Sequence, residues 1–355
     1  MKKITINHNI KDNLITYGIV LFAWIIVTLL SAAGLVSSLM QGLLVPLCVY
    51  VILAVSLNLT VGILGELSLG HAGFMCVGAF TGAFFSRYMQ NIITVDILRF
   101  IIAILIGAIS AGIIGFLIGM PVLRLKGDYL AIVTLAFGEI IKNIINVLYI
   151  GRDSKGLHFS MKDSISLGLE TDGEVLINGA QGITGTPKDS TFTIGIILII
   201  ITLIIVLNLI KSRDGRAIMS IRDNLIAAES IGINITKYKL MAFSISAALA
   251  GVAGVLYSHN LSSLMATPKS FGYNMSIMIL VFVVLGGIGN MRGSIIAAVI
   301  LTLLPELLRG LSNYRMLIYA IILIIMMLFN WSPKLINLRK RYSLKNFLHK
   351  NKEVQ

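Results

Sequence analysis

The sequence alternates between long apolar stretches and short polar segments along most of its 355 residues. A helix needs about 20 apolar residues to cross the hydrocarbon core of a membrane. Ten stretches come close to that length, and they lie at residues 14–35, 39–62, 66–86, 97–119, 128–150, 191–211, 239–258, 273–289, 293–310 and 314–331. The pattern predicts an all-α fold, in which one domain over residues 1–355 forms a polytopic transmembrane helical bundle of about ten spans.

Two of these stretches, the third and the eighth, are rich in glycine, which is typical of broken or re-entrant helices. A hairpin is predicted between the eighth and ninth stretches, because only residues 289–293 separate them. The second to fifth spans and the seventh to tenth spans would start on opposite sides of the membrane. That arrangement suits an inverted repeat.

Positive charge indicates the orientation, because lysine and arginine favour the cytoplasmic side of a membrane protein. If the amino terminus is cytoplasmic, the basic segments around Arg124 and Lys211 are cytoplasmic as well. Residues 151–190, whose charge balance is acidic, then form an external loop. The orientation predicts that both termini are cytoplasmic, with a cytoplasmic coupling loop at 212–238 and a basic cytoplasmic tail at 334–355.

Composition also places the protein in a lipid bilayer. Hydrophobic residues make up 57% of the chain and charged residues 13%, whereas a soluble domain is about one quarter charged. The net charge of +13 does not indicate nucleic-acid binding, because the basic residues gather beside apolar spans, where they suit anionic lipid headgroups. Cys48 and Cys76 lie inside apolar stretches, so neither a disulfide framework nor a metal site is expected.

One charged segment, Lys211–Lys239, interrupts the apolar sequence and predicts an amphipathic helix. Asp214-Gly215 is expected to form a turn before this helix, and Gly232 is placed to cap its end. The helical period separates an apolar face from a second face: Ile218, Ile221, Leu225 and Ala228 against Asp223, Ala227 and Ser230. Such a helix at the membrane surface is suited to bind a cytoplasmic partner, although an ordinary connecting loop explains the pattern equally well.

Polar residues and glycines coincide between Gly62 and Gly73, and they indicate an interrupted helix that lines a passage. Close packing of helices is the alternative explanation for each single glycine. The candidates for the translocation pathway are Gly65, Glu66, Ser68, Gly70, His71, Gly73, Glu139, Gly286, Gly287 and Gly289.

The ionisable residues in the spans also have local explanations. A charge at membrane depth costs about 3 kcal/mol on insertion scales, so each should face protein or water. Glu139 has Lys142 three residues further on, and Glu306 has Arg309 at the same spacing, so we expect ion pairs within one helix. His71 is expected to donate a hydrogen bond between packed helices.

The sequence contains no motif for chemistry on a substrate, neither an H-E-x-x-H helix nor a G-x-S-x-G turn. Residues Gly182–Lys188 (GITGTPK) are similar to a phosphate-binding loop, but they lack the Gly-Lys-Ser/Thr ending and fall in the external segment. The chain is therefore not expected to be an enzyme, and any ATP hydrolysis must occur in a separate subunit.

Four long stretches carry a resemblance to a known family, and they occur in the order Leu57–Phe80, Leu123–Ile140, Gly215–Gly254 and Val281–Arg309. Over nearly its full length the chain resembles the permease subunit of bacterial ABC importers for branched-chain amino acids, in the form with the longer external loop. The resemblance implies a multi-pass protein of the bacterial cytoplasmic membrane that translocates leucine, isoleucine or valine.

The resemblance also implies partners. A sister permease would complete the pore, an extracytoplasmic amino-acid-binding protein would deliver the cargo, and two ABC ATPase subunits would bind ATP and Mg, so no cofactor is expected in this chain. Permeases of this kind carry an E-A-A-x-x-x-G segment that docks into the ATPase. Ala227, Ala228 and Gly232 match it, whereas Ile226 replaces the acidic residue. Arg216 and Arg222 are candidates for further contacts with the ATPase.

A proton- or sodium-coupled secondary transporter is the alternative function, and it would use Glu66, His71 and Glu139 as a relay. An intramembrane enzyme has less support, because no nucleophile–base pair or metal site stands out. Relatives in the family also carry short amides and urea, and no single residue of this sequence selects the cargo.

Overall fold

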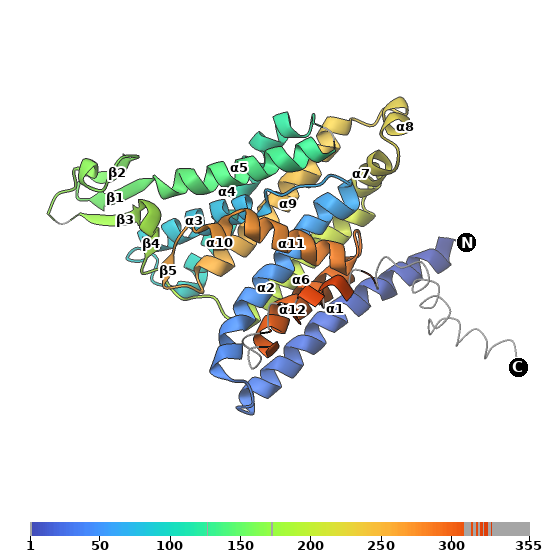
Figure 1. Ribbon diagram of the computed structural model, residues 1–355, viewed down its shortest axis with the longest axis horizontal. Coiled ribbons are helices and arrows are strands. Elements are labelled where there is room, and N and C mark those ends of the chain that lie inside the picture. The colour runs from blue at the N-terminus through green and yellow to red at the C-terminus, as the bar shows by residue number, and fades with distance from the viewer. Residues whose placement is uncertain are drawn as a thin grey trace, which may run out of the picture.

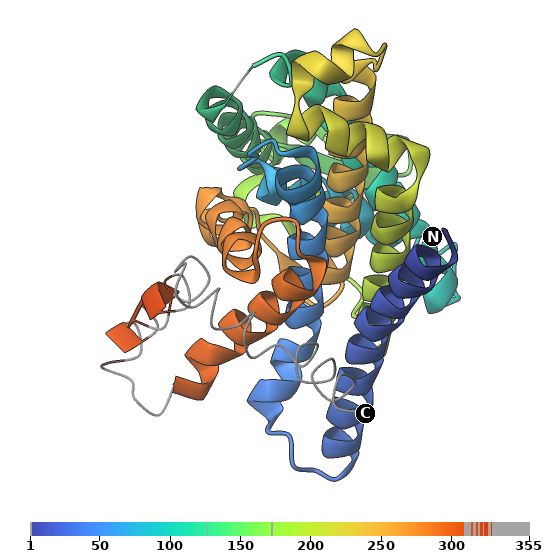
Figure 2. The same ribbon diagram turned by 90° about the vertical axis from the view of Figure 1, so that its right-hand side faces the viewer.

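Helices dominate the computed structural model, which describes residues 2–125, 127–171 and 173–308 and scattered positions between 314 and 328. Figures 1 and 2 show the long helices running alongside one another. The long helices are α1 (Lys2–Ala32), α2 (Ser38–Asn58), α3 (His71–Tyr88), α4 (Asp96–Val122), α5 (Asp128–Asn146), α6 (Phe192–Lys211), α9 (Ile235–Ser258), α11 (Tyr273–Gly286) and α12 (Met291–Leu307). The shorter helices are η1 (Leu59–Leu64), η2 (Ile165–Leu167), η3 (Gly179–Gln181), α7 (Arg213–Asp223), α8 (Leu225–Ser230) and α10 (Pro268–Phe271).

The long helices lie over the first nine apolar stretches predicted from the sequence. Within the described residues, six helical segments are long and apolar enough to cross a membrane: Ile15–Ala32, Ser38–Leu64, Asp96–Val122, Phe192–Lys211, Ile235–Ser258 and Pro268–Gly286. Most of the tenth predicted stretch, 314–331, and all of the basic tail, 334–355, lie outside the described residues.

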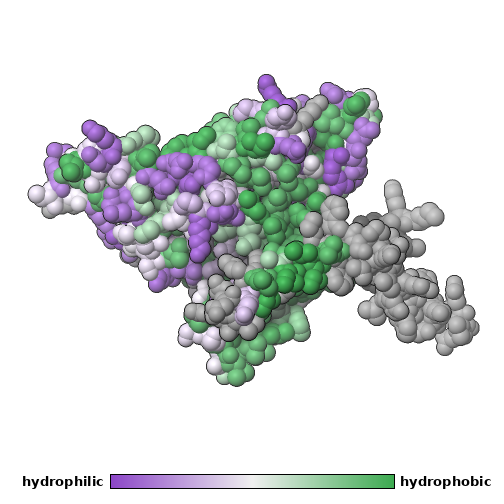
Figure 3. Space-filling model, viewed as in Figure 1, coloured by the Kyte–Doolittle hydropathy of each residue, from purple (hydrophilic) through white to green (hydrophobic). Residues whose placement is uncertain are grey.

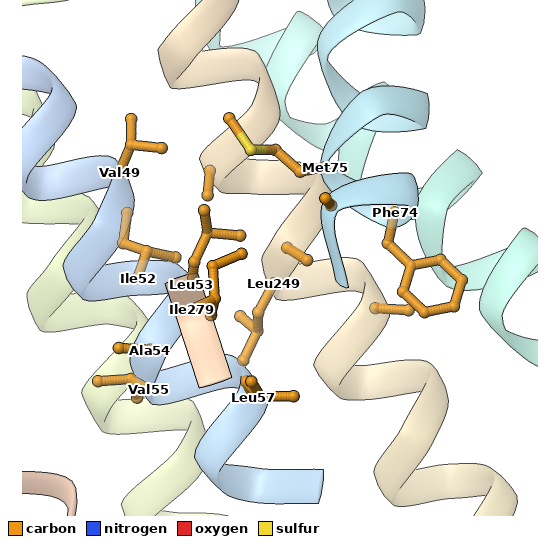
Figure 4. Close-up of a cluster of buried hydrophobic side chains, with 14 of the residues drawn as sticks. Val49, Ile52, Leu53, Ala54, Val55, Leu57, Phe74, Met75, Leu249 and Ile279 are labelled. Carbon is orange, nitrogen blue, oxygen red and sulfur yellow. The ribbon is translucent and has the colours of Figure 1, made fainter. Parts of the chain in front are cut away.

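Helix α9 lies at the centre of the bundle, where it packs against α2, α3 and α4. Figure 4 shows part of the apolar core, to which four helices contribute buried side chains: Val49, Ile52, Leu53 and Leu57 from α2, Met75 from α3, Leu249 from α9 and Ile279 from α11. Glycines bring α3 and α9 together, since a Cβ placed on Gly78 would lie 2.4 Å from the Gly251 Cα. Such close backbone approach is how membrane helices gain van der Waals contact.

The prediction of an all-α fold is wrong for the expected external loop, 151–190, because this segment contains β-strands. It carries most of a three-stranded antiparallel sheet in the order β2-β1-β3, formed by β1 (Tyr149–Asp153), β2 (Gly156–Ser160) and β3 (Glu174–Asn178). Asp153 Oδ1 holds the turn between β1 and β2 by accepting hydrogen bonds from the Lys155 and Gly156 amides, at 2.8 and 3.1 Å. Five-residue strands give only a short alternating pattern, which explains why the sequence indicated a loop.

A second sheet ties this segment to the bundle, because β4 (Ile183–Thr184) pairs with β5 (Ser263–Leu264), which follows α9. Figure 1 shows the three-stranded sheet at one end of the molecule and α7 and α8 at the other end. Figure 2 shows α7 and α8, in yellow and olive, covering that end of the long helices. The two polar segments are therefore separated by the length of the apolar bundle.

Candidate functional site

The main irregularity of the bundle lies between α2 and α3, where the sequence predicts an interrupted helix. Helix α2 passes into η1, a π-helical turn that ends at Gly65, where φ is +81°. Helix α3 begins only at His71, so residues 65–70 are not helical. Glycine at position 65 lets the chain leave the helix, because residues with a Cβ are strained at this φ. We call residues 65–70 the break.

Hydroxyl groups of α5 and α11 accept hydrogen bonds from one backbone amide in the break and from one in the first turn of α3. Thr134 Oγ1 accepts a hydrogen bond from the Leu69 amide at 3.0 Å, and Ser276 Oγ accepts one from the Ala72 amide at 3.1 Å. Thr134 and Ser276 are both buried. An unpaired backbone amide inside a membrane protein is costly, so these hydroxyls explain how non-helical chain is tolerated here.

Three polar side chains in or next to the break have partners within the protein. Two of these partners, Lys239 and Ser246, lie on α9. Glu66 forms an ion pair with Lys239, and the two side chains are only 16% and 7% exposed. The buried His71 has its Nε2 3.1 Å from the Ser246 Oγ, and the buried Ser68 accepts a hydrogen bond from the Gly70 amide. Pairing of Glu66 offsets part of the cost of removing its charge from water.

Helix α7 reaches the same place through Arg222. The Arg222 Nη1 donates a hydrogen bond to the Gly62 carbonyl oxygen at 2.8 Å, and its Nη2 pairs with Asp223 at 2.9 Å. The stem of Arg222 covers Gly65, since a Cβ placed there would lie 2.5 Å from the Arg222 Cγ. Helix α7 is thus joined directly to the π-helical turn that precedes the break.

The second glycine cluster, Gly286–Gly289, packs against this same turn. Gly287 and Gly289 adopt φ values of +93° and +80°, which end α11 and reverse the chain toward α12. A Cβ placed on Gly62 would lie 2.4 Å from the Gly289 nitrogen. Two glycine clusters that are far apart in the sequence therefore form one contact.

Asn58 joins these clusters, and the sequence pattern did not single it out. Its Oδ1 accepts a hydrogen bond from the Gly289 amide at 2.8 Å, and its Nδ2 donates one to the Ser294 Oγ at 2.9 Å. The side chain is fully buried. A lone amide side chain inside an apolar stretch was the available signal, because a buried polar group needs a hydrogen-bond partner.

The predicted amphipathic helix is in fact two helices. Helix α7 ends at Asp223 and α8 starts at Leu225, with Asn224 between them at φ −156° and ψ 104°. Asn224 Oδ1 caps α8 by accepting a hydrogen bond from the Ala227 amide at 3.0 Å, which explains the interruption. The predicted turn at Asp214-Gly215 is wrong, because both residues lie inside α7 and Ser212 is its cap.

The two faces of this segment agree with the predicted periodicity. Ile218, Ile221 and Ala228 are buried and Leu225 is half-buried, whereas Asp223, Ala227 and Ser230 are exposed. Gly232 ends α8 at a φ of +85°, which confirms the predicted cap. Beside Ala227, the side chains of Ile226 and Ile231 are 78% and 74% exposed. Arg216 is also exposed and donates a hydrogen bond to the Lys211 carbonyl at 3.1 Å.

Glu139 on α5 forms the predicted ion pair with Lys142. Its Oε1 also accepts a hydrogen bond from the Tyr273 amide at 2.8 Å, so the carboxylate connects α5 to the first residue of α11. One turn along α3 from the break, Gly73 packs against Gly138, since a Cβ there would lie 2.7 Å from the Gly138 Cα. The other predicted pair, Glu306 with Arg309, involves a residue outside the described part of the chain.

Comparison with known proteins decides the family. Residues 39–329 match the family described as branched-chain amino acid transport system / permease component. The chain belongs to this family. It is a permease subunit rather than an enzyme, and with its apolar helices it is a multi-pass membrane protein.

Two curated relatives are high-affinity branched-chain amino acid transport system permease proteins named LivM. The chain is 35% identical to LivM of Salmonella typhimurium over 296 residues, which cover 81% of this chain and 67% of LivM. It is 35% identical to LivM of Escherichia coli over 318 residues, which cover 86% and 72%. A weaker match is the autoinducer 2 import system permease protein LsrC of Yersinia enterocolitica, 27% identical over 159 residues, which cover 40% of this chain and 43% of LsrC. No solved structure matches the chain.

Proposed function

We propose that this chain is the pore-forming permease subunit of an ATP-driven importer for leucine, isoleucine and valine in the bacterial cytoplasmic membrane. A sister permease completes the pore, an extracytoplasmic binding protein delivers the amino acid, and two ABC ATPase subunits bind ATP and Mg. The names of the LivM relatives support the cargo. The hydrogen bond between Arg222 and Gly62 supports the coupling mechanism, because it joins α7 to the π-helical turn that precedes the break.

The proposed orientation places α7 and α8 in the cytoplasm and the three-stranded sheet outside. Their positions at opposite ends of the bundle are consistent with this assignment (Figure 1). Basic residues such as Arg213 and Arg216 gather at the α7 end, as the positive-inside rule requires for a cytoplasmic segment. About ten spans with both termini in the cytoplasm complete this topology.

Helices α7 and α8 form the proposed handle for the ATPase. Ala227 allows close approach of the partner, because its side chain is small and exposed. Ile226 and Ile231 flank Ala227 with exposed apolar surface. Hydrophobic contact through this surface replaces the salt bridge that an acidic residue at position 226 would make. Arg216 adds a charged contact at the edge of this surface.

Movement of the handle reaches the pore through the break. When the ATPase subunits close on ATP they displace α7, and Arg222 transmits this displacement to the Gly62 carbonyl. Non-helical backbone at the end of a helix absorbs such changes in φ and ψ more readily than helix does. The Gly286–Gly289 turn follows because it packs on Gly62. The importer then alternates between outward-open and inward-open states.

Purification of the complete importer tests this proposal. Ala227→Trp places a bulky side chain on the handle, so we expect both the ATPase subunits that co-purify and leucine uptake into proteoliposomes to fall about tenfold or more. Asn91→Trp is the matched control, because Asn91 is exposed in the turn after α3, away from the handle. Wild-type assembly and uptake of Ala227→Trp would refute the proposed docking surface.

A second pair of variants separates docking from coupling. Arg222→Gln removes the cation that holds the Gly62 carbonyl but leaves the exposed face of α8 unchanged, so the ATPase should bind and hydrolyse ATP while uptake is lost. Arg216→Gln should instead weaken binding of the ATPase. If Arg222→Gln leaves the number of amino acids carried per ATP unchanged, the coupling route through the break is wrong.

The structure does not favour the proton- or sodium-coupled alternative. Glu66 is paired with Lys239, Glu139 with Lys142, and His71 lies against Ser246, so each member of the supposed relay has its own partner. Uptake into vesicles that contain ATP should therefore resist a protonophore. Loss of uptake with the protonophore, at constant ATP, would support the alternative.

A further inference from the structure

The face of the bundle formed by α5, α10 and α11 exposes polar groups beside apolar side chains, which on α5 include Ile132, Ile140 and Ile144. Figure 3 shows hydrophilic side chains over the region where Figure 1 places α5 and α10. The residues of this polar face with partly or fully exposed side chains are Glu139 and Asn143 on α5, Lys269 on α10, and Tyr273 and Asn274 on α11.

Helix α4 presents the opposite kind of surface. Between Ile97 and Leu117 its most exposed side chains are all apolar: Ile97, Leu98, Ile101, Leu105, Ile109, Ile113, Phe116 and Leu117. A surface of this composition fits lipid, whereas a carboxylate or amide in contact with hydrocarbon is costly. The carboxylate and amide groups of the polar face are therefore expected to meet water or protein rather than lipid.

Glu139 and Lys142 are the charged centre of the polar face. The Glu139 side chain is 26% exposed and the Lys142 side chain 7%, so the pair is reached from the Glu139 side. The Tyr273 amide holds the carboxylate in place from α11. One turn beyond Tyr273 on the same helix, Ile277 is 43% exposed and offers apolar contact beside the charges.

We infer that Glu139 and Lys142 form a subsite in the pore for the charged groups of the amino acid, and this inference rests on the proposed function. The ion pair opens as the amino acid arrives. The α-ammonium then donates hydrogen bonds to the Glu139 carboxylate, and the Lys142 ammonium donates to the α-carboxylate. One ion pair is exchanged for two, and the exposed Ile277 contacts the branched side chain.

Charge balance favours this cargo over an anion or a cation. The empty pair is neutral and a zwitterion is neutral, so the site carries no uncompensated charge in either state. An uncompensated charge would be expensive in a bundle of low polarity. The three-residue spacing on one helix keeps both charges on the same side of α5, where one amino acid can reach both of them.

Thiol labelling tests whether water reaches the polar face, and this measurement does not depend on transport. Ala136→Cys lies near the middle of α5 on its exposed side, one turn from Glu139, and Ile109→Cys lies near the middle of α4, where Ile109 is 60% exposed. In the assembled importer, a charged thiol reagent should modify Ala136→Cys at least about tenfold faster than Ile109→Cys. The wild-type chain is the blank, because Cys48 and Cys76 are buried. Equal rates would overturn the inference.

Neutral variants test the subsite itself. Glu139→Gln keeps an acceptor for the Tyr273 amide but removes the negative charge, so leucine uptake per folded importer should fall about tenfold, while the thermal unfolding midpoint reports the separate cost of leaving the Lys142 ammonium unpaired. Lys142→Gln should act in the same way, and Asp128→Asn, which removes an exposed carboxylate at the start of α5, is the control. Wild-type uptake by Glu139→Gln would overturn the subsite. Absence of ATP-driven uptake by the wild-type importer would instead refute the proposed function, and the labelling result would still decide whether the face is wet.

Discussion

Two groups of glycines in this bundle answer different physical needs. The first group lies within α3, α4 and α9 and faces the backbone or side chains of neighbouring helices: Gly78, Gly107, Gly251 and Gly254. The second group has positive φ at the end of a helix or in the turn that follows it: Gly65, Gly232, Gly287 and Gly289. The first group makes room for other helices, whereas the second group lets the chain leave a helix.

The difference teaches that glycine content alone does not reveal a passage. A Cβ on a glycine of the first group would collide with fixed atoms, so its cost arises from space. A Cβ on a glycine of the second group would strain the backbone whatever the space around it. Substitution by alanine should therefore destabilise the protein to a different extent in the two groups. Substitution by asparagine, which tolerates positive φ, should relieve the backbone strain in the second group but not the collision in the first group.

Gly254→Ala should have the largest effect. The added Cβ would lie 2.1 Å from the Met75 carbonyl oxygen and 2.7 Å from the Ala79 nitrogen, and neither backbone atom can move without shifting α3. We expect a loss of about 3 kcal/mol in the free energy of unfolding, or failure of the protein to accumulate. Thermal unfolding in detergent, followed by size-exclusion chromatography, measures it. A midpoint equal to that of the wild type would show that the α3–α9 contact is loose.

Gly65→Ala should come next, with a loss of about 2 kcal/mol from the φ of +81°. It should also uncouple ATP hydrolysis from uptake, because the Cβ would displace the Arg222 Cγ, 2.5 Å away. Gly65→Asn relieves the backbone strain but keeps the collision, so it should be stable and still uncoupled. If the Gly65→Asn importer still couples ATP hydrolysis to uptake, Arg222 has no part in the coupling mechanism.

Gly232→Ala measures the cost of backbone strain without a steric collision. The φ at this residue is +85°, and no atom of another described residue beyond its chain neighbours lies within 4 Å of an added Cβ, so only strain at the end of α8 is expected, about 1 kcal/mol. Gly232→Asn should be close to wild type. Hydrogen exchange of the α8 amides measures the local loss, and equal protection in the Ala and Asn variants would contradict the assignment of strain.

Gly18→Ala should have the smallest effect. Gly18 lies in α1 without a positive φ, and no neighbouring element among the described residues has an atom within 4 Å of an added Cβ. Alanine is the better helix former, so the free energy of unfolding should be unchanged or rise by up to about 1 kcal/mol. A clear loss of thermal stability would reveal a neighbour of α1 in the assembled importer.

Local pairs were predictable and distant pairs were not. The Glu139–Lys142 pair followed from its three-residue spacing, and the cap at Gly232 followed from the end of the helical period. The pairing of Glu66 with Lys239 joins residues 173 positions apart, and no periodicity of the sequence specifies it. The contact between Arg222 and Gly62 spans 160 positions and escaped prediction for the same reason.

The sequence by itself determined where the helices lie and that one of them is interrupted near Gly65, because hydrophobic length and glycine act within a few residues of chain. Only the tertiary structure decided that Gly62 meets Gly289, that Asn58 joins them, and that α7 holds the turn before the break. The physical reason is packing: which backbones approach each other depends on the shapes of whole helices, and short-range patterns carry no record of those shapes.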